Sequence, residues 1–241
     1  NTPDGFNINR DCGSTHPEKL QQRVLDEKAD LGVALDGDAD RLIMVDHTGK
    51  LVDGDQLLFV VARDRKESGA DMPGVVGTLM SNFGLELALQ AQGIEFVRAK
   101  VGDRYVMEQL DQRGWLIGGE SSGHLVCLDC TSTGDGTVSA LQVLAALSRR
   151  DQSLADAVAD VALLPQTMIN VRGSSRDGFM DKAEVKAAMA DVEGKLGGNG
   201  RILLRPSGTE PLVRVMIEGK DADQVASLCR ELADVVEKAI A

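Results

Sequence analysis

Blocks of apolar and polar positions alternate over the first two thirds of the chain. Short apolar runs between turn residues predict strands, and longer stretches with apolar side chains three or four positions apart predict helices. We predict strands at residues 31–35, 42–45, 74–78, 95–99 and 115–118. We predict helices at residues 17–28, 53–68, 82–92, 103–113 and 135–148. This alternation predicts an α/β fold with a parallel or mixed sheet, and the continuous run at 31–35 is typical of a buried parallel strand.

The pattern changes after a short alanine-rich helix and linker at residues 151–164. We predict strands at residues 167–172, 201–204 and 212–218 and helices at residues 181–196 and 221–240. The last helix carries its apolar side chains on one face, namely Val225, Leu228, Leu232, Val235 and Ala239. The order of elements therefore predicts a mixed-sheet α/β part followed by a smaller C-terminal α+β domain.

Composition limits the possible functions of the chain. Its 241 residues are 43% hydrophobic but only 3% aromatic, so aliphatic side chains must build the cores. The formal net charge of -12 argues against binding to nucleic acid or to an anionic membrane. No apolar run approaches the roughly 20 residues of a membrane span. The sequence lacks a signal peptide and a disulfide-type cysteine pattern, and we therefore expect a cytoplasmic protein.

Three carboxylates follow the apolar run 31–35 at alternate positions. Asp36, Asp38 and Asp40 are followed directly by Arg41. Like charges this close repel one another unless a cation lies among them, and clustered oxygen ligands suit Mg²⁺ or Ca²⁺. The neighbouring guanidinium group matches a phosphate. A metal cluster beside a phosphate-binding group at the end of a strand is typical of phosphoryl transfer.

Other interpretations of this loop stay open. An EF-hand also begins with alternate aspartates, but it needs Gly and Glu where this chain has Arg41 and His47. A phosphatase of the haloacid-dehalogenase type would use Asp36 as its nucleophile, but it expects Thr or Val at the position of Asp40. A solvated acidic turn needs one aspartate and a glycine rather than three spaced carboxylates.

A second candidate site lies in residues 118–124, where small residues surround Glu120, Ser122 and His124. Such a loop can approach a polyol closely, and its carboxylate and hydroxyl groups can bind adjacent sugar hydroxyls. His124 is a candidate acid or base near neutral pH. A structural role for this histidine stays open.

A third candidate site is the turn at residues 205–211, which Arg214 follows. Arginine, two hydroxyls and a glycine-opened turn can form an anion site; these residues are Arg205, Ser207, Gly208, Thr209 and Arg214. An ordinary β-turn between two strands is the alternative.

Two further motifs are weaker. Lys100 and Arg104 flank a predicted strand-to-helix turn, where the start of a helix favours phosphate, although Asp103 at this point also suits a helix N-cap. Cys127 and Cys130 form a C-x-x-C pair, but no strand-to-helix context and no further ligands accompany them. Reduced thiols are therefore favoured over a redox or zinc site.

The three loops, taken together and in this order, resemble those of the α-D-phosphohexomutase superfamily. Further matching segments lie at residues 7–9, 12–14, 76–82, 99–105 and 133–136. The resemblance covers essentially all 241 residues. Within the superfamily it points to the bacterial members that act on glucosamine phosphates.

The resemblance implies four domains around a central cleft. Residues 1–48 would be the C-terminal part of the second α/β domain, residues 49–160 the third α/β domain, and residues 161–241 the phosphate-binding C-terminal domain. The family's phosphoserine loop has no equivalent in this sequence. Because the chain also begins with Asn1, we expect it to be the C-terminal portion of a longer protein, inactive as a mutase when isolated.

The resemblance also implies a role for each candidate residue. Mg²⁺ would bind to Asp36, Asp38 and Asp40. Glu120 and Ser122 would grip the sugar hydroxyls. The phosphate that is not reacting would bind to Arg205, Ser207, Gly208, Thr209 and Arg214. The remaining catalytic candidates would line the cleft, namely Arg41, Lys100, Arg104 and, as acid or base, His124.

The implied reaction interconverts glucosamine 6-phosphate and glucosamine 1-phosphate for the synthesis of UDP-N-acetylglucosamine and peptidoglycan. It would pass through a phosphoserine and glucosamine 1,6-bisphosphate, which would also be the activator. Two alternatives stay open: a relative that acts on glucose or mannose phosphates, and a catalytically silent fragment that binds a sugar phosphate or a metal. A homodimer also stays open.

Overall fold

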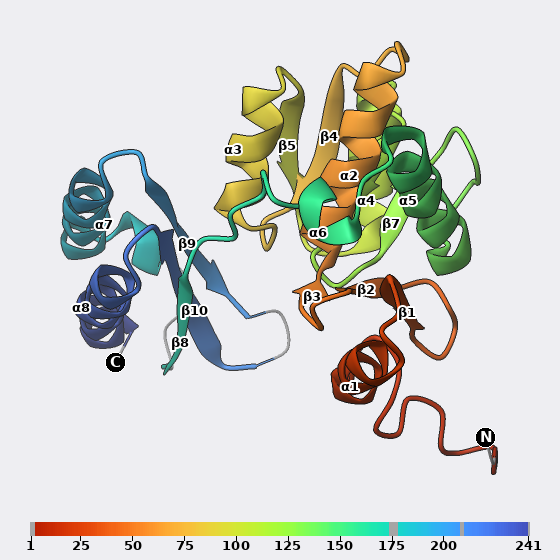
Figure 1. The fold of residues 1–241 in the computed structure, drawn as a ribbon. Coiled ribbons are helices and arrows are strands. Elements are labelled where there is room, and N and C mark those ends of the chain that lie inside the picture. Colours follow the sequence, from red (N-terminus) through yellow and green to blue (C-terminus); the bar gives the residue numbers. More distant parts are fainter. Residues whose placement is uncertain (1–2, 174–177, 208–209, 241) are drawn as a thin grey trace. The chain divides into compact units, whose positions relative to one another are not determined.

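The computed structural model describes residues 3–173, 178–207 and 210–240 of the chain. The chain divides between Ala162 and Leu163 into two compact units (Figure 1). Each unit has its own hydrophobic core. Among the described residues, no helix combines the length and the apolar character that crossing a bilayer requires.

The first unit contains two sheets. Strands β1 (Leu31–Leu35), β2 (Leu42–Asp46) and β3 (Leu51–Val52) form an antiparallel sheet in that order. The second sheet has the order β5-β4-β6-β7, with β4 (Gly74–Thr78) parallel to β5 (Glu95–Ala99) and to β6 (Ile117–Gly119). Strand β7 (Leu125–Cys127) pairs antiparallel with β6. The mixed sheet of the α/β part is thereby confirmed.

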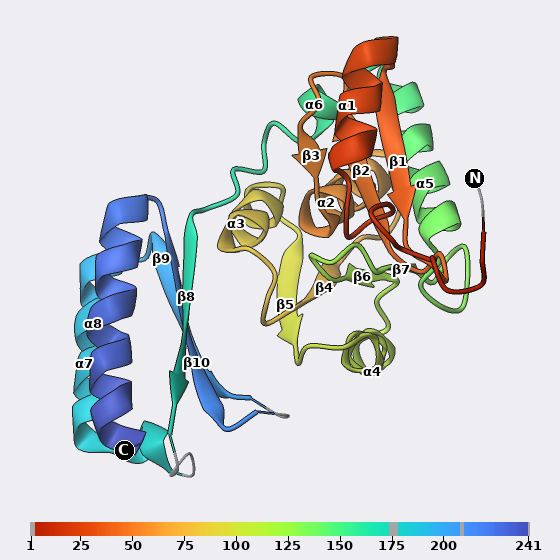
Figure 2. The same cartoon turned by 90° about the horizontal axis from the view of Figure 1, so that it is seen from below.

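Helices cover both faces of the second sheet, namely α2 (Gly54–Glu67), α3 (Phe83–Ala91), α4 (Asp103–Arg113) and α5 (Gly136–Arg150). Helix α1 (Glu18–Glu27) packs on β1 and β2 of the first sheet, and the short α6 (Leu154–Ala157) follows α5. Successive side chains of a strand point to opposite faces. On β4, Val75 packs in the core with α2, α3 and α5, whereas Val76 packs with α4. Figure 2 shows α2 and α3 on one side of β4 and α4 on the other.

The prediction that residues 31–35 form a parallel strand is wrong. Only residues 36–41 connect β1 to β2, and a parallel connection needs roughly a dozen residues or more, so the two strands pair antiparallel. Strand β1 lies at the edge of its sheet, where Gly32 and Ala34 are shielded while Val33 is exposed. The short strands β3 and β7 had no counterpart among the predicted elements.

The second unit is an α+β fold, as predicted. Strands β8 (Gln166–Arg172), β9 (Gly200–Pro206) and β10 (Leu212–Gly219) form an antiparallel sheet with β10 in the centre. The 3₁₀ helix η1 (Phe179–Asp181) precedes α7 (Ala183–Leu196), and α8 (Ala222–Ile240) ends the unit. The predicted apolar face of α8 forms part of the core, with Val225, Leu228, Leu232 and Ala239 buried and Val235 half-buried. The three-part division at residues 48 and 160 stays a prediction.

Candidate functional site

The acidic loop gathers three carboxylates at the end of β1. Oxygen atoms of Asp36, Asp38 and Asp40 all lie within 4.8 Å of one another. The turn is held by its own first residue, because Asp36 Oδ1 accepts the backbone N–H of Arg41 at 3.1 Å and the Asp36 carbonyl accepts that of Ala39 at 3.2 Å. Ala39 has a left-handed backbone with φ 60°. The loop thus brings alternate side chains to one place.

Two basic groups face this acidic cluster. Arg41 Nε lies 3.8 Å from Asp36 Oδ2, and His124 Nδ1 lies 3.0 Å from Asp40 Oδ2. Asp38 is exposed and belongs to neither pair. The cluster therefore keeps an excess of negative charge, and its oxygen donors fit a hard divalent cation such as Mg²⁺.

The loop that carries Glu120 is a tight turn between β6 and β7. The backbone N–H of Glu120 donates to the His124 carbonyl at 2.9 Å, and that of Gly123 donates to the Glu120 carbonyl at 3.0 Å. Gly123 has φ +97°, where a side chain would collide with the backbone of Leu42. Glu120 Oε1 accepts the backbone N–H of Gly102 at 2.9 Å, which leaves Oε2 for a ligand. Ser122 is exposed at the tip of the turn.

The acidic loop and the Glu120 loop are joined directly. Arg41 and His124 form an antiparallel bridge, and the backbone N–H of Leu42 donates to the Gly123 carbonyl at 2.9 Å. The start of α5 joins them, because the N–H of Gly136 donates to the Ala39 carbonyl at 2.8 Å. The structure therefore brings the three aspartates, Arg41, Glu120 and His124 together within one unit.

His124 is buried between the acidic loop and the start of α5. Its side chain is 8% exposed, with Nδ1 at Asp40 and Nε2 against Gly134, where a Cβ atom would collide with the ring. The imidazole orientation is therefore fixed from both sides. Sequence reasoning missed the pairing of His124 with Asp40, because the bridge between Arg41 and His124 joins segments far apart in the chain and no local pattern marks it.

Lys100 and Arg104 lie on either side of the turn from β5 to α4, and both are exposed. Lys100 Nζ lies 5.6 Å from the centre of the Tyr105 ring. Lys100 lines a cavity of about 290 Å³ together with Arg98 and Glu108, whereas Arg104 is not among its lining residues. Gly102, with φ 123°, is the N-cap of α4, so Asp103 is the first helical residue rather than the cap. Through the Gly102–Glu120 hydrogen bond, this turn is connected to the Glu120 loop.

In the second unit, two arginines face each other across β9 and β10. Arg205 and Arg214 are direct cross-strand partners, and the Nε atom of each is buried with no hydrogen-bond partner among the described residues. Burial, and then the positive charge of Arg214, lower the pKa of Arg205. Paired guanidinium groups with unused donors indicate an anion-binding site.

The turn beside these arginines is closed by Ser207. Its backbone N–H donates to the Leu212 carbonyl at 2.8 Å, and its Oγ accepts the N–H of Glu210 at 3.2 Å. Glu210 lies 3.7 Å from Arg214. The predicted residues Gly208 and Thr209 lie outside the described residues.

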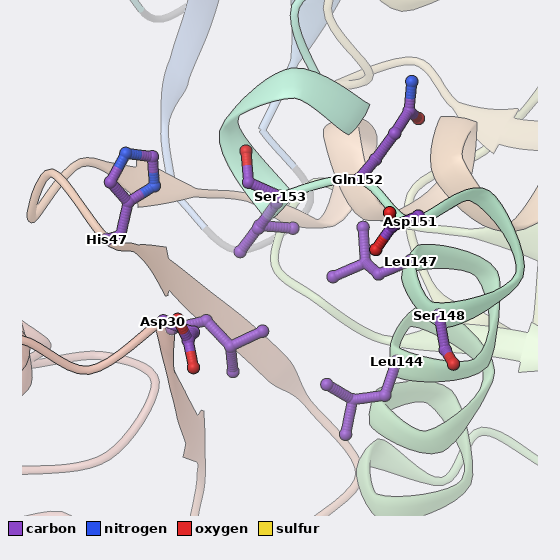
Figure 3. A pocket seen from close by; sticks show the side chains of 10 residues that line it. Asp30, His47, Leu144, Leu147, Ser148, Asp151, Gln152 and Ser153 are labelled. Carbon is purple, nitrogen blue, oxygen red and sulfur yellow. The ribbon is translucent and has the colours of Figure 1, made fainter.

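A separate cavity of about 590 Å³ lies at the opposite end of β1 (Figure 3). Asp30 and His47 face the side chains of Leu144 and Leu147 across it. None of the predicted site residues lines this cavity.

The C-x-x-C pair has the properties of reduced thiols. Cys127 is buried on β7, and burial together with the charge of Asp129 raises its pKa to about 12. Burial and Asp129 also raise the pKa of the exposed Cys130. Because the thiolate is the reactive and metal-binding form, raised pKa values disfavour both redox and zinc chemistry.

Comparisons with known proteins identify the family of this chain. The family profile "Phosphoglucomutase/phosphomannomutase, alpha/beta/alpha domain III" matches residues 53–163, and the profile of that family's C-terminal domain matches residues 168–235. Phosphoglucosamine mutase of Alcanivorax borkumensis is 85% identical over 240 residues, which are 100% of this chain and 54% of that protein. Phosphoglucosamine mutase of Thioalkalivibrio sulfidiphilus is 58% identical over 97% of this chain and 52% of its own length. The chain thus spans about half the length of these curated relatives.

Solved structures show the same fold. N-acetylphosphoglucosamine mutase of Aspergillus fumigatus, in complex with GlcNAc-6P and magnesium, has a TM-score of 0.77 at 22% identity over 97% of this chain and 54% of that protein. A second structure of the Aspergillus enzyme gives a TM-score of 0.79 over 96% of this chain and 53% of that protein. The two matching profiles and the relatives together show that this chain belongs to the phosphoglucomutase/phosphomannomutase family, of which it carries domain III and the C-terminal domain.

Proposed function

We propose that this chain is part of a phosphoglucosamine mutase that interconverts glucosamine 6-phosphate and glucosamine 1-phosphate. The observation that carries the proposal is the direct connection of the three-aspartate cluster to the Glu120 loop through Asp40 and His124. This connection supports the proposal because the three carboxylates and the Glu120 loop would then serve as the cation site and the sugar site for transfer of a phosphoryl group to a hydroxyl. The 85% identity to a phosphoglucosamine mutase supports the amino sugar as substrate.

In this proposal, Asp36, Asp38 and Asp40 hold Mg²⁺. When bound there, Mg²⁺ would neutralise the charge of the transferring phosphoryl group. Arg41 adds a positive charge beside the cluster. The phosphoserine that donates the group is supplied from outside these 241 residues, and glucosamine 1,6-bisphosphate is the intermediate and activator.

The remaining residues bind and orient the sugar phosphate. Glu120 has one carboxylate oxygen available for sugar hydroxyls or for the amino group, and the exposed Ser122 adds a hydroxyl. His124 Nδ1 lies 3.0 Å from Asp40 Oδ2, and we propose that this pairing orients His124 as an acid or base for the reacting hydroxyl. Lys100 and Arg104 attract the phosphate of the incoming sugar. Arg205, Ser207 and Arg214, with Gly208 and Thr209, hold the phosphate that is not reacting. We expect the enzyme to act in the cytoplasm.

The test uses a chimera in which this chain replaces the matching half of the Alcanivorax enzyme. With Mg²⁺ and the bisphosphate activator, we expect turnover with the highest kcat/KM for glucosamine 6-phosphate. Glucose 6-phosphate and mannose 6-phosphate are the comparison substrates, and the unaltered Alcanivorax enzyme is the positive control. Preference for a neutral hexose would replace the proposed substrate, and turnover by the isolated chain would refute the need for an external phosphoserine.

Arg214→Met is expected to raise the KM of the chimera for its sugar phosphate by about 10- to 100-fold. A hydrogen bond to a charged group contributes about 1.5–3 kcal/mol, which corresponds to this loss. Relief of the repulsion between Arg214 and Arg205 offsets loss of the weak, partly exposed ion pair between Arg214 and Glu210, so the free energy of unfolding should change little. The exposed Arg230→Met in the same unit is the control, and an unchanged KM for Arg214→Met would remove this residue from the phosphate site.

A further inference from the structure

Asp55 is a buried carboxyl group that the proposed mechanism does not use. It lies in the first turn of α2, and none of its surface is exposed. Its Oδ2 accepts the backbone N–H of Asn82 at 2.7 Å, and the Ser81 side chain also forms a hydrogen bond with it. Its Oδ1 is buried without a hydrogen-bond partner among the described residues. A buried acid that is only partly hydrogen-bonded is costly, and its presence needs an explanation.

On one side, Asp55 borders the turn that carries Glu120. Gly54, the residue before it, donates its N–H to the Ser121 carbonyl at 3.1 Å. A Cβ atom on Gly54 would collide with the carbonyl oxygen of Glu120 and with the backbone of Gly123. The backbone of the first turn of α2 therefore lies directly against the Glu120 loop. These contacts are the route by which a shift of Asp55 would reach the Glu120 loop through Gly54.

On the other side, Asp55 borders the loop from β4 to α3, which is held firmly. Arg98 of β5 donates to the carbonyl oxygens of Thr78 at 3.1 Å and of Ser81 at 2.6 Å, and it pairs with Glu86 of α3 at 2.9 Å. Asn82 caps α3 through its side chain, which accepts the N–H of Gly84 at 2.9 Å. Asp55 thus connects the β4–α3 loop, which Arg98 holds in place, to the first turn of α2, against which the Glu120 loop packs.

We propose that Asp55 is a positioning residue that sets the place of the Glu120 loop by binding α2 to the β4–α3 loop, more tightly in its ionised form. The consequence for sugar binding rests on the proposed function, whereas the coupling between the two loops does not. The ionised carboxylate is the better acceptor for the Asn82 N–H and for Ser81, so loss of the proton should draw the two loops together.

The charged groups around Asp55 place the loss of its proton near neutral pH. Asp53 faces it from the start of α2, Arg98 from β5, and Glu86 from α3 through its ion pair with Arg98. Burial, followed by repulsion from Asp53, raises the pKa of Asp55 to about 7, although Asn82, Ser81 and Arg98 oppose this shift. Burial also raises the pKa of Asp53. His124 belongs to the Glu120 loop itself, whose turn is closed by the hydrogen bond from the Glu120 N–H to the His124 carbonyl, so a His124 variant serves as a comparison.

The experiment follows the backbone amide signals of the 241-residue chain by NMR between pH 5 and pH 9. We expect the amides of Gly54, Ser121, Gly123 and Asn82 to shift with a common midpoint near pH 7. This shared titration of the four amides should disappear in Asp55→Asn and persist in His124→Gln. Asp64→Asn, which removes a buried carboxylate from the other end of α2, should leave it in place.

Two results would overturn the proposal: loop amides that do not titrate in the unaltered chain, or a titration that survives in Asp55→Asn. In the chimera, Asp55→Asn should raise the KM for the sugar phosphate several-fold at pH 8 but not at pH 6, with the protein folded at both. If the chimera shows no mutase turnover at all while the amides behave as expected, the proposed function fails and the coupling stands.

Discussion

Asp38→Asn is expected to weaken the binding of Mg²⁺ to this chain by at least about tenfold. Even side chains one step removed from a metal commonly contribute about 10- to 100-fold to its affinity, and Asp38 would be a direct ligand. Asp38 is the informative position because Asp36 also holds the loop through Arg41 and Asp40 also holds His124. Its replacement should therefore turn a charged ligand into a neutral, weaker one without loosening the turn. Calorimetric titration with Mg²⁺, repeated with Mn²⁺, measures the effect.

The control for Asp38 is Asp11→Asn. Asp11 is exposed and has a left-handed backbone with φ 52°, which asparagine tolerates well. The Asp11→Asn substitution removes one negative charge from the same unit but none from the three-aspartate cluster. Equal Mg²⁺ affinities for the two variants would mean that general negative charge attracts the ion and that the cluster is not its site.

Activity and stability should change together with metal affinity. A bound metal ion stabilises a transferring phosphoryl group by several kcal/mol, so turnover of the chimera should fall about 1,000-fold in Asp38→Asn. A ligand that binds only the folded chain also raises its melting temperature. Mg²⁺ should therefore raise the Tm of the unaltered chain more than that of the variant. An unchanged turnover would exclude Asp38 from the reaction.

The sequence was sufficient for most elements because their signals are local. The apolar stripe of α8 and the alternation of strands and helices depend on residues within one or two turns of each other, and the structure contains these elements. The orientation of β1 depended on a different property, the length of its connection. Residues 36–41 are too few for a parallel crossover, a sign that was present in the sequence but outweighed by the uniformly apolar run.

Most residues of the candidate site could be identified from the sequence, but the contacts between them could not. Three aspartates at alternate positions stand out in any sequence, and so does a carboxylate among glycines. The contacts of Asp40 with His124 and of Gly102 with Glu120 join segments far apart in the chain. They depend on strand pairing that no local pattern encodes. Asp55 was overlooked for the same reason, since an aspartate near the start of a helix normally indicates only favourable interaction with the helix dipole.

Asp55→Asn is expected to change how the stability of this chain depends on pH. A carboxyl group whose pKa is higher in the folded protein contributes its full stability below the unfolded pKa and loses it as the pH rises through the folded pKa. For Asp55 these values are 3.8 and about 7. At about 1.4 kcal/mol per pH unit, the loss amounts to at most about 4 kcal/mol between pH 4 and pH 8. Asparagine keeps an acceptor for the Asn82 N–H but carries no charge, so it avoids this loss.

The free energy of unfolding, measured with urea from pH 4 to pH 8, should therefore favour Asp55→Asn increasingly as the pH rises. The informative quantity is how the difference in free energy of unfolding between Asp55→Asn and the unaltered chain changes with pH. Any cost of the buried amide that is the same at every pH does not affect this change. Asp11→Asn reports the effect of losing one surface charge over the same range. A constant difference between Asp55→Asn and the unaltered chain would show that Asp55 does not titrate in the folded protein over this range. If the difference in free energy of unfolding widens as the pH rises, the unaltered chain retains a destabilising charge at Asp55. Such a cost is expected at a residue that is kept for positioning the Glu120 loop rather than for stability.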